Sequence, residues 1–473
     1  MTRALGAAGN EELKTPNLDK LAARGRRFTN FFCASPVCSP ARASILTGQI
    51  PSKHGVLDWI RSGSMDRELM KERNVQNPYG GYSSEDKPIQ YLADQRCYTD
   101  ALYEAGYNVA LSGKWHLGDS MTPQHGFKRW YTIGKGGAHY FHPDIIENGE
   151  VTIENTYVTD LFTKRALEFI EEMRQEDKPF YLNINYTAPH DPWGPEHHKE
   201  EDLALYNDCP FLSTPDIPDH PHGTRGPVYG TPTRQENLRG YYAAITAMDR
   251  SIGEVMAYLE THNLLENTYV FFMADNGMNM GHHGIWGKGN GTFPQNMYEE
   301  SVKVPFIALL PEEDTPGQVI DQMCSQIDFY PTLLDLLDIE DAHVETLPGK
   351  SMKPLLSGTP GTQEIHEELF ICEEYGTVRM LREQRYKYIH RYPFGHHELY
   401  DLLEDPREEN NLYGLPEQEE RILEMRKKLE TWFSKYMDPA KDGAKEGVTG
   451  LGQLTQLGSS ADKVERFYIE ATK

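Results

Sequence analysis

A cysteine and an arginine stand about one helical turn apart in the segment VCSPARAS, which begins at Val37. Pro40 is typical of the first turn of a helix, so Cys38 is expected at a helix N-terminus, where free backbone N–H groups and the helix dipole favour an anion. Arg42 would project from the same face. Two interpretations stay open on these residues alone: a buried cysteine beside a helix cap, or a thiol whose pKa the helix and Arg42 lower.

Three more polar clusters stand directly after apolar stretches that are typical of strands. The stretches YNVAL (107–111), PFYLNINY (179–186) and TYVFFMA (268–274) lead into Lys114 and His116, into His190, and into Asp275 and Asn276, respectively. Taken singly, each cluster is typical of a turn or a solvated loop. Functional groups of parallel α/β sheets gather beyond the carboxyl ends of the strands, so the shared placement of these clusters predicts one site.

The elements that must position these clusters form an alternation of helices and strands. Apolar residues recur at steps of three and four through YYAAITAMDRSIGEVMAYLETH (241–262), which predicts a helix directly before the strand at 268–274. A short helix is expected near 100–105, ahead of the strand at 107–111. This repeated order predicts an α/β fold with a mainly parallel central sheet, covered by helices on both faces.

The pattern changes after Gly358. ELFICEE (368–374), TVRMLRE (377–383) and RYKYIHRY (385–392) predict short strands of an antiparallel sheet, and 417–436 predicts an amphipathic helix. The linker Ser357-Gly358-Thr359-Pro360-Gly361 predicts a boundary. We therefore expect a catalytic domain over residues 1–360 and a smaller antiparallel-sheet subdomain with a tail over 361–473.

The composition excludes several classes of protein. The 473 residues carry a net charge of −25, which argues against a nucleic-acid partner, and an anionic substrate would need positive charge concentrated in one pocket. Six dispersed cysteines without a CxxC pair argue against a disulfide framework and a structural zinc site. No apolar run is long enough to span a bilayer, so no membrane partner is expected. The opening MTRALGAAGNEELK has no hydrophobic leader segment, and the compartment is not predicted.

The segment Cys38-Ser39-Pro40-Ala41-Arg42 matches the C-x-P-x-R signature of the type I sulfatases. Further segments resemble blocks of that family, in the same order and along nearly the whole chain: TPNLDKLAARGRRFTNFF, LTGQIPSKHGV, GKWHLG, TAPHDP, ADNG, GIWGKG, SVKVPFIALLP, SQIDFYPTLLDLL, LPGKSMKPLLSG and ELYDLLEDPREENNL. The resemblance implies an alkaline-phosphatase-like α/β fold with a smaller C-terminal antiparallel sheet. It also implies hydrolysis of sulfate monoesters.

In this family the signature cysteine is converted to formylglycine, an aldehyde, by a formylglycine-generating enzyme. The resemblance therefore implies that Cys38 is the precursor of the nucleophile. One hydroxyl of the hydrated aldehyde attacks the sulfur and the alcohol leaves; the second hydroxyl then loses its proton and sulfate is expelled. A thiol has no second hydroxyl, so an unmodified cysteine is not expected to turn over by this route.

The resemblance also implies roles for the charged residues. Arg42, Lys114 and Lys288 match cations that surround the sulfuryl group. His116 matches the residue that hydrogen-bonds the formylglycine hydroxyl and acts as the base in the elimination of sulfate. His190 matches the histidine that contacts the sulfate and protonates the leaving oxygen, either alone or together with Lys288.

Asp275, Asn276 and the modified Cys38 match ligands of a divalent cation, usually Ca²⁺, in agreement with the preference of that ion for hard oxygen atoms. Family members also carry an apolar first strand that ends in two metal-binding Asp residues, shortly before the TPNLD block. This chain has no Asp ahead of Asp19. We therefore expect that the chain is truncated at Met1, that it lacks the first strand, and that its metal binding and activity are weak.

Substrate specificity is weakly encoded. Trp59 and Arg61 follow the signature segment. In one interpretation, Trp59 stacks on a sugar and Arg61 binds a carboxylate or a second sulfate. In the other, Trp59 packs internally and Arg61 lies in solvent. We expect a sulfated carbohydrate as substrate. Two alternatives remain open: a phosphonate or phosphodiester hydrolase of the same superfamily, and a folded but inactive sulfatase-like binding protein.

Overall fold

The computed structural model describes residues 4–66, 87–226, 228–311, 317–358, 364–448 and 450–457. Their strands form a five-stranded sheet, two four-stranded sheets and a two-stranded sheet. The predicted linker at 357–361 lies partly outside these residues. The division into 1–360 and 361–473 therefore stays a prediction.

Two of the sheets build the larger part of the molecule, with strand orders β6-β5-β4-β3-β7 and β10-β1-β9-β8. The strands are β1 Arg26–Phe28, β3 Asn108–Gly113, β4 Arg129–Ile133, β5 Asp144–Glu147, β6 Glu150–Ile153, β7 Phe180–Asn185, β8 Val270–Met273, β9 Phe306–Leu309 and β10 Gln318–Ile320, and β2 Phe31–Phe32 pairs with β11 Cys324–Ser325. β3 is parallel to β4 and β7, whereas β9 is antiparallel to both of its neighbours. The predicted α/β class is confirmed, and its sheets mix both directions.

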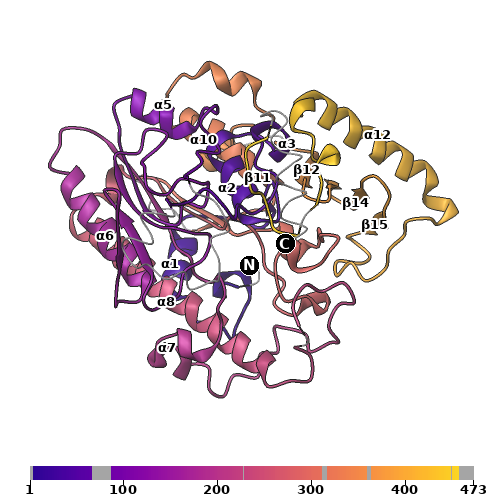
Figure 1. Ribbon diagram of the computed structural model, residues 1–473, viewed down its shortest axis with the longest axis horizontal. Coiled ribbons are helices and arrows are strands. Elements are labelled where there is room, and N and C mark those ends of the chain that lie inside the picture. The colour runs from indigo at the N-terminus through magenta and orange to yellow at the C-terminus, as the bar shows by residue number, and fades with distance from the viewer. Residues whose placement is uncertain are drawn as a thin grey trace.

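Helices cover both faces of these sheets, as predicted. They are α1 Pro16–Arg24, α2 Cys38–Thr47, α3 Pro51–His54, α5 Tyr98–Glu104, α6 Val158–Met173, α7 Glu200–Ala204, α8 Thr233–Thr261, α9 Glu299–Val302, α10 Phe329–Leu336 and α11 Lys353–Leu356. Successive residues of a strand face opposite sides, so Val109 and Leu111 of β3 join the buried cluster of α2, α5 and α10, whereas Ala110 joins that of α6 and α8. Figure 1 shows these two groups of helices on either side of the sheets.

The predicted antiparallel C-terminal sheet is confirmed, with the order β12-β13-β14-β15. Its strands are β12 Glu368–Glu373, β13 Val378–Glu383, β14 Tyr386–Arg391 and β15 Glu398–Asp401, and α12 Glu419–Tyr436 follows. Phe370 packs with Leu429 and Phe433 of α12, whereas Leu369 and Ile371 on the opposite face join the main core. The sheet therefore lies as a layer between α12 and the larger part of the molecule (Figure 1).

β7 and β8 each have an edge without a strand partner. In the described part of the chain, β7 pairs only with β3, and β8 pairs only with β9. All residues of both strands are half-buried, whereas β9 is fully buried. The two strands share one core: Tyr98 contacts Tyr181 of β7 and Phe329, which contacts Phe271 of β8. The predicted absence of a first strand stays a prediction.

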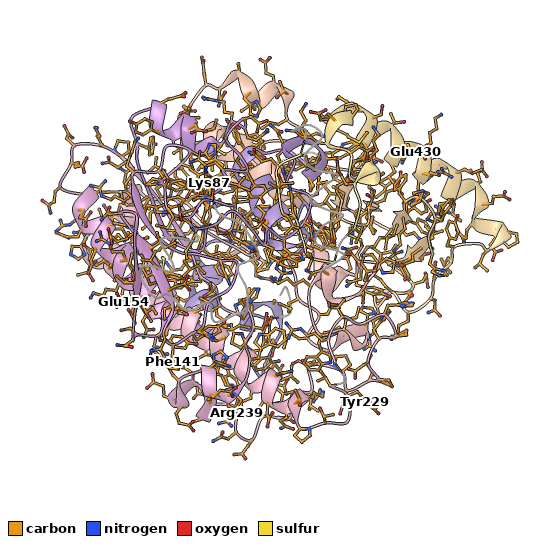
Figure 2. All side chains as sticks on the ribbon, viewed as in Figure 1. Lys87, Phe141, Glu154, Tyr229, Arg239 and Glu430 are labelled. Atoms are coloured by element: carbon orange, nitrogen blue, oxygen red, sulfur yellow. The ribbon has the colours of Figure 1, made fainter. Side chains whose placement is uncertain are left out.

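Side chains fill the space between these layers, and Tyr229 ahead of α8 and Glu430 on α12 lie at the rim (Figure 2). All six cysteines are free thiols, in agreement with the prediction of no disulfide framework. Within the described ranges, no helix combines the length and the apolar character that crossing a bilayer requires.

Candidate active site

Segments distant in sequence bring the predicted polar clusters together. α2 begins at Cys38 and ends before Gly48, whose φ of 66° suits glycine. The loops after β3, β7 and β8 meet this helix. The Lys114 N–H donates to the Asn185 carbonyl at the end of β7 (2.8 Å), and Lys114 Nζ lies 3.9 Å from Asp275 Oδ2 just after β8. The carboxyl ends of the three strands therefore share one site, as the sequence predicts.

The Cys38 side chain lies at the centre of this site. It is 4% exposed, and Lys288 Nζ lies 2.6 Å from its Sγ. Burial raises the pKa of the thiol, but Lys114, Lys288, His116 and His190 together outweigh burial and hold the pKa well below its ordinary value. The site therefore stabilises negative charge at this position.

Lys114 and Lys288 form the positive wall of the site. They are 3% and 9% exposed, respectively. Burial lowers the pKa of Lys114, whereas at Lys288 the neighbouring Cys38 and Asp275 outweigh burial and raise the pKa. Together with Arg42, these two buried ammonium groups outnumber the Asp275 carboxylate and the Cys38 thiolate, which leaves an excess of positive charge. An anionic substrate would neutralise it.

His116 is held as a neutral imidazole. Its backbone has a φ of 58°, and its Nε2 lies 3.0 Å from the Ile60 carbonyl oxygen. Burial, followed by Lys114, lowers the pKa of His116 to about 4. Nε2 must carry the proton in order to donate to a carbonyl, so Nδ1 is the acceptor. This Nδ1 is buried and has no partner with hydrogen-bond geometry among the residues that the structure describes, and the neighbouring Cys38 side chain raises the pKa of the ring.

His190 has the opposite protonation preference. Its Nδ1 lies 2.8 Å from the Asp191 carbonyl oxygen and 3.0 Å from the Asp191 carboxylate. Burial and Lys288 lower the pKa of His190, but Asp191 and Cys38 outweigh them and raise it. Arg225 holds the other carboxylate oxygen of Asp191 at 3.1 Å. His190 is therefore suited to donate a proton at a pH where His116 accepts one.

Arg42 is bound to the loop that follows β3. Its Nε donates to the Trp115 carbonyl at 2.9 Å, a second guanidinium nitrogen donates to the Lys114 carbonyl, and a third lies 3.5 Å from Asp275 Oδ2. The guanidinium thus ties α2 to two other strand ends. Beyond adding charge, Arg42 positions Lys114 and Asp275.

Asp275 and Asn276 present oxygen atoms that suit a divalent cation. Asn276 Nδ2 donates to the Gly277 carbonyl at 2.7 Å, and Asn276 Oδ1 is buried without a hydrogen-bond partner in the described ranges. An orphaned buried oxygen beside a carboxylate fits a pair of ligands for a hard cation. These two side chains carry a single negative charge between them.

Trp59 and Arg61 lie against the C-terminal tail. The Gln453 N–H donates to the Trp59 carbonyl at 2.9 Å, and the Arg61 N–H donates to the Gln453 carbonyl at 3.2 Å. Gly452 packs on the Trp59 ring so closely that a Cβ there would lie 2.7 Å from Cε2. One side of the Trp59 ring is therefore used for packing. Both side chains are half-buried.

Neither Asp191 nor Lys135 is predicted from the sequence as a member of the site. Asp191 directly follows His190 within TAPHDP, and a carboxylate next to a candidate acid is the sequence feature that could have identified it. Lys135 follows β4, and nothing in the sequence places that loop near His116.

A family model described as Sulfatase matches residues 2–339, and a model of the N-sulphoglucosamine sulphohydrolase C-terminal part matches residues 281–435. The chain belongs to the sulfatase family. It is a hydrolase that acts on sulfuric esters. The family implies a divalent metal and a formylglycine-type cysteine.

Individual relatives agree with this assignment. An N-acetylglucosamine-6-O-sulfatase of Bacteroides thetaiotaomicron is 26% identical over 93% of this chain and 86% of its own length. An ulvan-active sulfatase of Formosa agariphila is 28% identical over 93% of this chain and 80% of its own length. A protein solved in complex with its substrate D-glucosamine-2-N,6-O-disulfate has a TM-score of 0.72 at 24% identity, covering 94% of this chain and 97% of that chain, a likeness that shows the fold. The alternative of a phosphonate or phosphodiester hydrolase is not favoured.

Proposed function

We propose that this sulfatase hydrolyses sulfate esters of carbohydrates and that Cys38, converted to formylglycine, supplies its nucleophile. The surroundings of Cys38 carry the proposal: it stands at a helix N-terminus, 4% exposed, with Lys288 Nζ at 2.6 Å from Sγ. Its Sγ marks where a hydroxyl of the hydrated aldehyde would stand. Conversion requires a formylglycine-generating enzyme as a maturation partner.

The modified residue supplies one hydroxyl for attack on sulfur and a second for release of sulfate. Lys114 and Lys288 bind the sulfuryl oxygens and offset their negative charge. His116, neutral and with Nδ1 unpaired among the described residues, accepts the proton of the second hydroxyl when sulfate is expelled. His190, charged through its contact with Asp191, donates a proton to the leaving alcohol oxygen.

A Ca²⁺ ion is the metal that the donor atoms support best, because Asp275 and Asn276 offer a carboxylate and an amide oxygen. When bound, the ion would add positive charge near the nucleophile and the sulfate. The modified Cys38 would complete the ligands that this chain provides. The names of the relatives, an N-acetylglucosamine-6-O-sulfatase and an ulvan-active sulfatase among them, support a sugar sulfate as the substrate.

Release of inorganic sulfate from glucosamine 6-sulfate, measured beside release of phosphate from glucosamine 6-phosphate, tests the proposal. We expect sulfate release by protein with formylglycine at position 38. Lys114→Ala, His190→Ala and Lys288→Ala should each lower kcat/KM by roughly 10²-fold or more, the scale of removing one transition-state donor. Exposed Lys164→Ala is the matched control, and unchanged rates in all three site variants would place the reaction elsewhere.

A substitution of Asp191 should change the pH profile. Asp191→Asn removes the carboxylate that raises the pKa of His190, so the imidazole loses its proton at lower pH. The protonated form is the acid and exists below its pKa, so the alkaline limb of kcat/KM should move to lower pH. The profile of the exposed control Asp208→Asn should stay in place. An unmoved alkaline limb in Asp191→Asn would contradict the role of His190.

A further inference from the structure

Arg225 stands on a segment that is bound to the loop of Lys288, and its guanidinium reaches Asp191 beside His190. We propose that Arg225 is a positioning residue, which fixes His190 in the orientation in which the ring donates a proton to the leaving alcohol. The proposal rests on the proposed function and adds to it the residue that holds the acid in place.

Thr224 binds the backbone ahead of Arg225 to the loop that carries Lys288. Its N–H donates to the Gly291 carbonyl at 2.9 Å, and its Oγ1 donates to the Asn290 carbonyl at 3.0 Å. The Gly291 N–H in turn donates to the Lys288 carbonyl at 2.9 Å. The backbone from which Arg225 projects is therefore fixed relative to a cation of the site.

The guanidinium of Arg225 contacts two residues that follow His190 in the chain. One of its nitrogens lies 3.1 Å from Asp191 Oδ2, and its Cζ lies 4.7 Å from the centre of the Trp193 ring. Trp193 is 2% exposed, and its Nε1 donates to the Pro189 carbonyl at 3.0 Å. A planar guanidinium can stack on an aromatic ring and bind a carboxylate at the same time. Arg225 therefore fastens the turn that contains His190 from one side.

Asp191 transmits this placement to the imidazole of His190. His190 Nδ1 lies 3.0 Å from Asp191 Oδ1, whereas Arg225 holds Oδ2, so the two carboxylate oxygens have different partners. Nδ1 is thereby occupied, and Nε2 is the ring nitrogen left to face the leaving oxygen. Without Arg225 the carboxylate is free to rotate, and the ring loses its fixed orientation. A misplacement of about 1 Å can cost on the order of 10²-fold in rate, so a contact outside the reaction can limit its speed.

Two sulfate esters with different leaving groups test this role in protein with formylglycine at position 38. A sugar alkoxide needs a proton in order to leave, whereas 4-nitrophenolate leaves without one. Arg225→Gln should lower kcat for glucosamine 6-sulfate by about tenfold, and kcat for 4-nitrophenyl sulfate by less than about twofold. Arg225→Lys keeps a charged donor for Asp191 and should limit the loss to about threefold. Arg426→Gln, which breaks a surface pair with Glu430 and changes the net charge equally, is the control.

A double variant separates positioning from direct binding of the substrate. In a His190→Ala background, Arg225→Gln should not lower kcat for glucosamine 6-sulfate any further, because Arg225 acts through an acid that is absent. A further loss in that background would mean that the guanidinium binds the substrate itself. Equal losses for both esters, or no loss for either, would likewise overturn the proposal.

Hydrogen exchange keeps the test independent of turnover. The His190 N–H donates to the Thr187 carbonyl at 2.8 Å, and the peptide that covers residues 187–193 should exchange roughly tenfold faster in Arg225→Gln, with no change in α12. If the unsubstituted protein releases sulfate from neither ester, faster exchange would count against the proposed function and leave the placement of His190 by Arg225 standing. Unchanged exchange in such a protein would overturn that placement as well.

Discussion

Hydrolysis of a sulfate ester should fall by on the order of 10⁵-fold when Cys38 is replaced by alanine, the scale of removing a catalytic nucleophile. Alanine cannot be converted to an aldehyde, and it offers no atom where Lys288 Nζ now lies 2.6 Å from Sγ. The two lysines and both histidines remain, so the sulfate group should still bind. The loss should therefore appear in kcat, measured by sulfate release under saturating substrate.

Cys33→Ala is the matched control for this substitution. Cys33 is also buried, and its replacement by alanine removes the same sulfur atom. Cys33 Sγ, however, contacts the Ser301 carbonyl at 3.7 Å and not the lysines of the site. We expect Cys33→Ala to lower stability slightly and to keep kcat within a few-fold. Equal losses in both variants would mean that activity follows folding and not the nucleophile.

An apolar strand of about six residues that ends in Asp-Asp, added ahead of Met1, should raise the melting temperature, Ca²⁺ affinity and turnover together. Within the described ranges, β7 and β8 each have one unpaired edge, which can exchange backbone hydrogen bonds with an added strand, and their half-buried side chains would become buried. The two carboxylates would arrive near Asp275 and Asn276, which alone supply one negative charge to an ion that prefers six to eight oxygen atoms.

A matched extension that ends in Asn-Asn separates the two effects. Both extensions should raise the melting temperature by about 5 °C or more, because both can pair with the open edges of β7 and β8. Only the Asp-Asp form should strengthen Ca²⁺ binding, by on the order of 100-fold in calorimetry. Equal Ca²⁺ affinity in the 473-residue chain and the Asp-Asp form would show that the metal site is completed in another way.

Much of the fold could be predicted because its elements carry strong local patterns. β3, β7, β8 and α12 lie within a few residues of their predicted positions, since each combines a periodic apolar pattern with a clear boundary. The hairpin of β5 and β6 and the antiparallel placement of β9 were not predicted. Strand pairing depends on neighbours that are distant in sequence, and these strands are only four residues long.

In the site, too, the residues that follow a local pattern could be predicted and those that depend on distant neighbours could not. Cys38, Lys114 and Asp275 could be predicted because strand ends and a helix start bring them to one edge. The contacts that hold these three side chains in place could not be predicted. Loop geometry that no local pattern encodes brings Arg42 to the Lys114 carbonyl. It also places the loop of Lys135 against His116.

Turnover as a function of formylglycine content tests the central claim most directly. Protein made with and without a formylglycine-generating enzyme is assayed for sulfate release, and mass spectrometry of the tryptic peptide from Phe28 to Arg42 gives the converted fraction at Cys38, with Cys33 in the same peptide as an internal reference. The strand-extended protein is assayed in parallel. We expect turnover to rise in proportion to conversion at Cys38 and to vanish without conversion. Equal turnover from protein in which Cys38 is wholly a thiol would contradict the role of formylglycine.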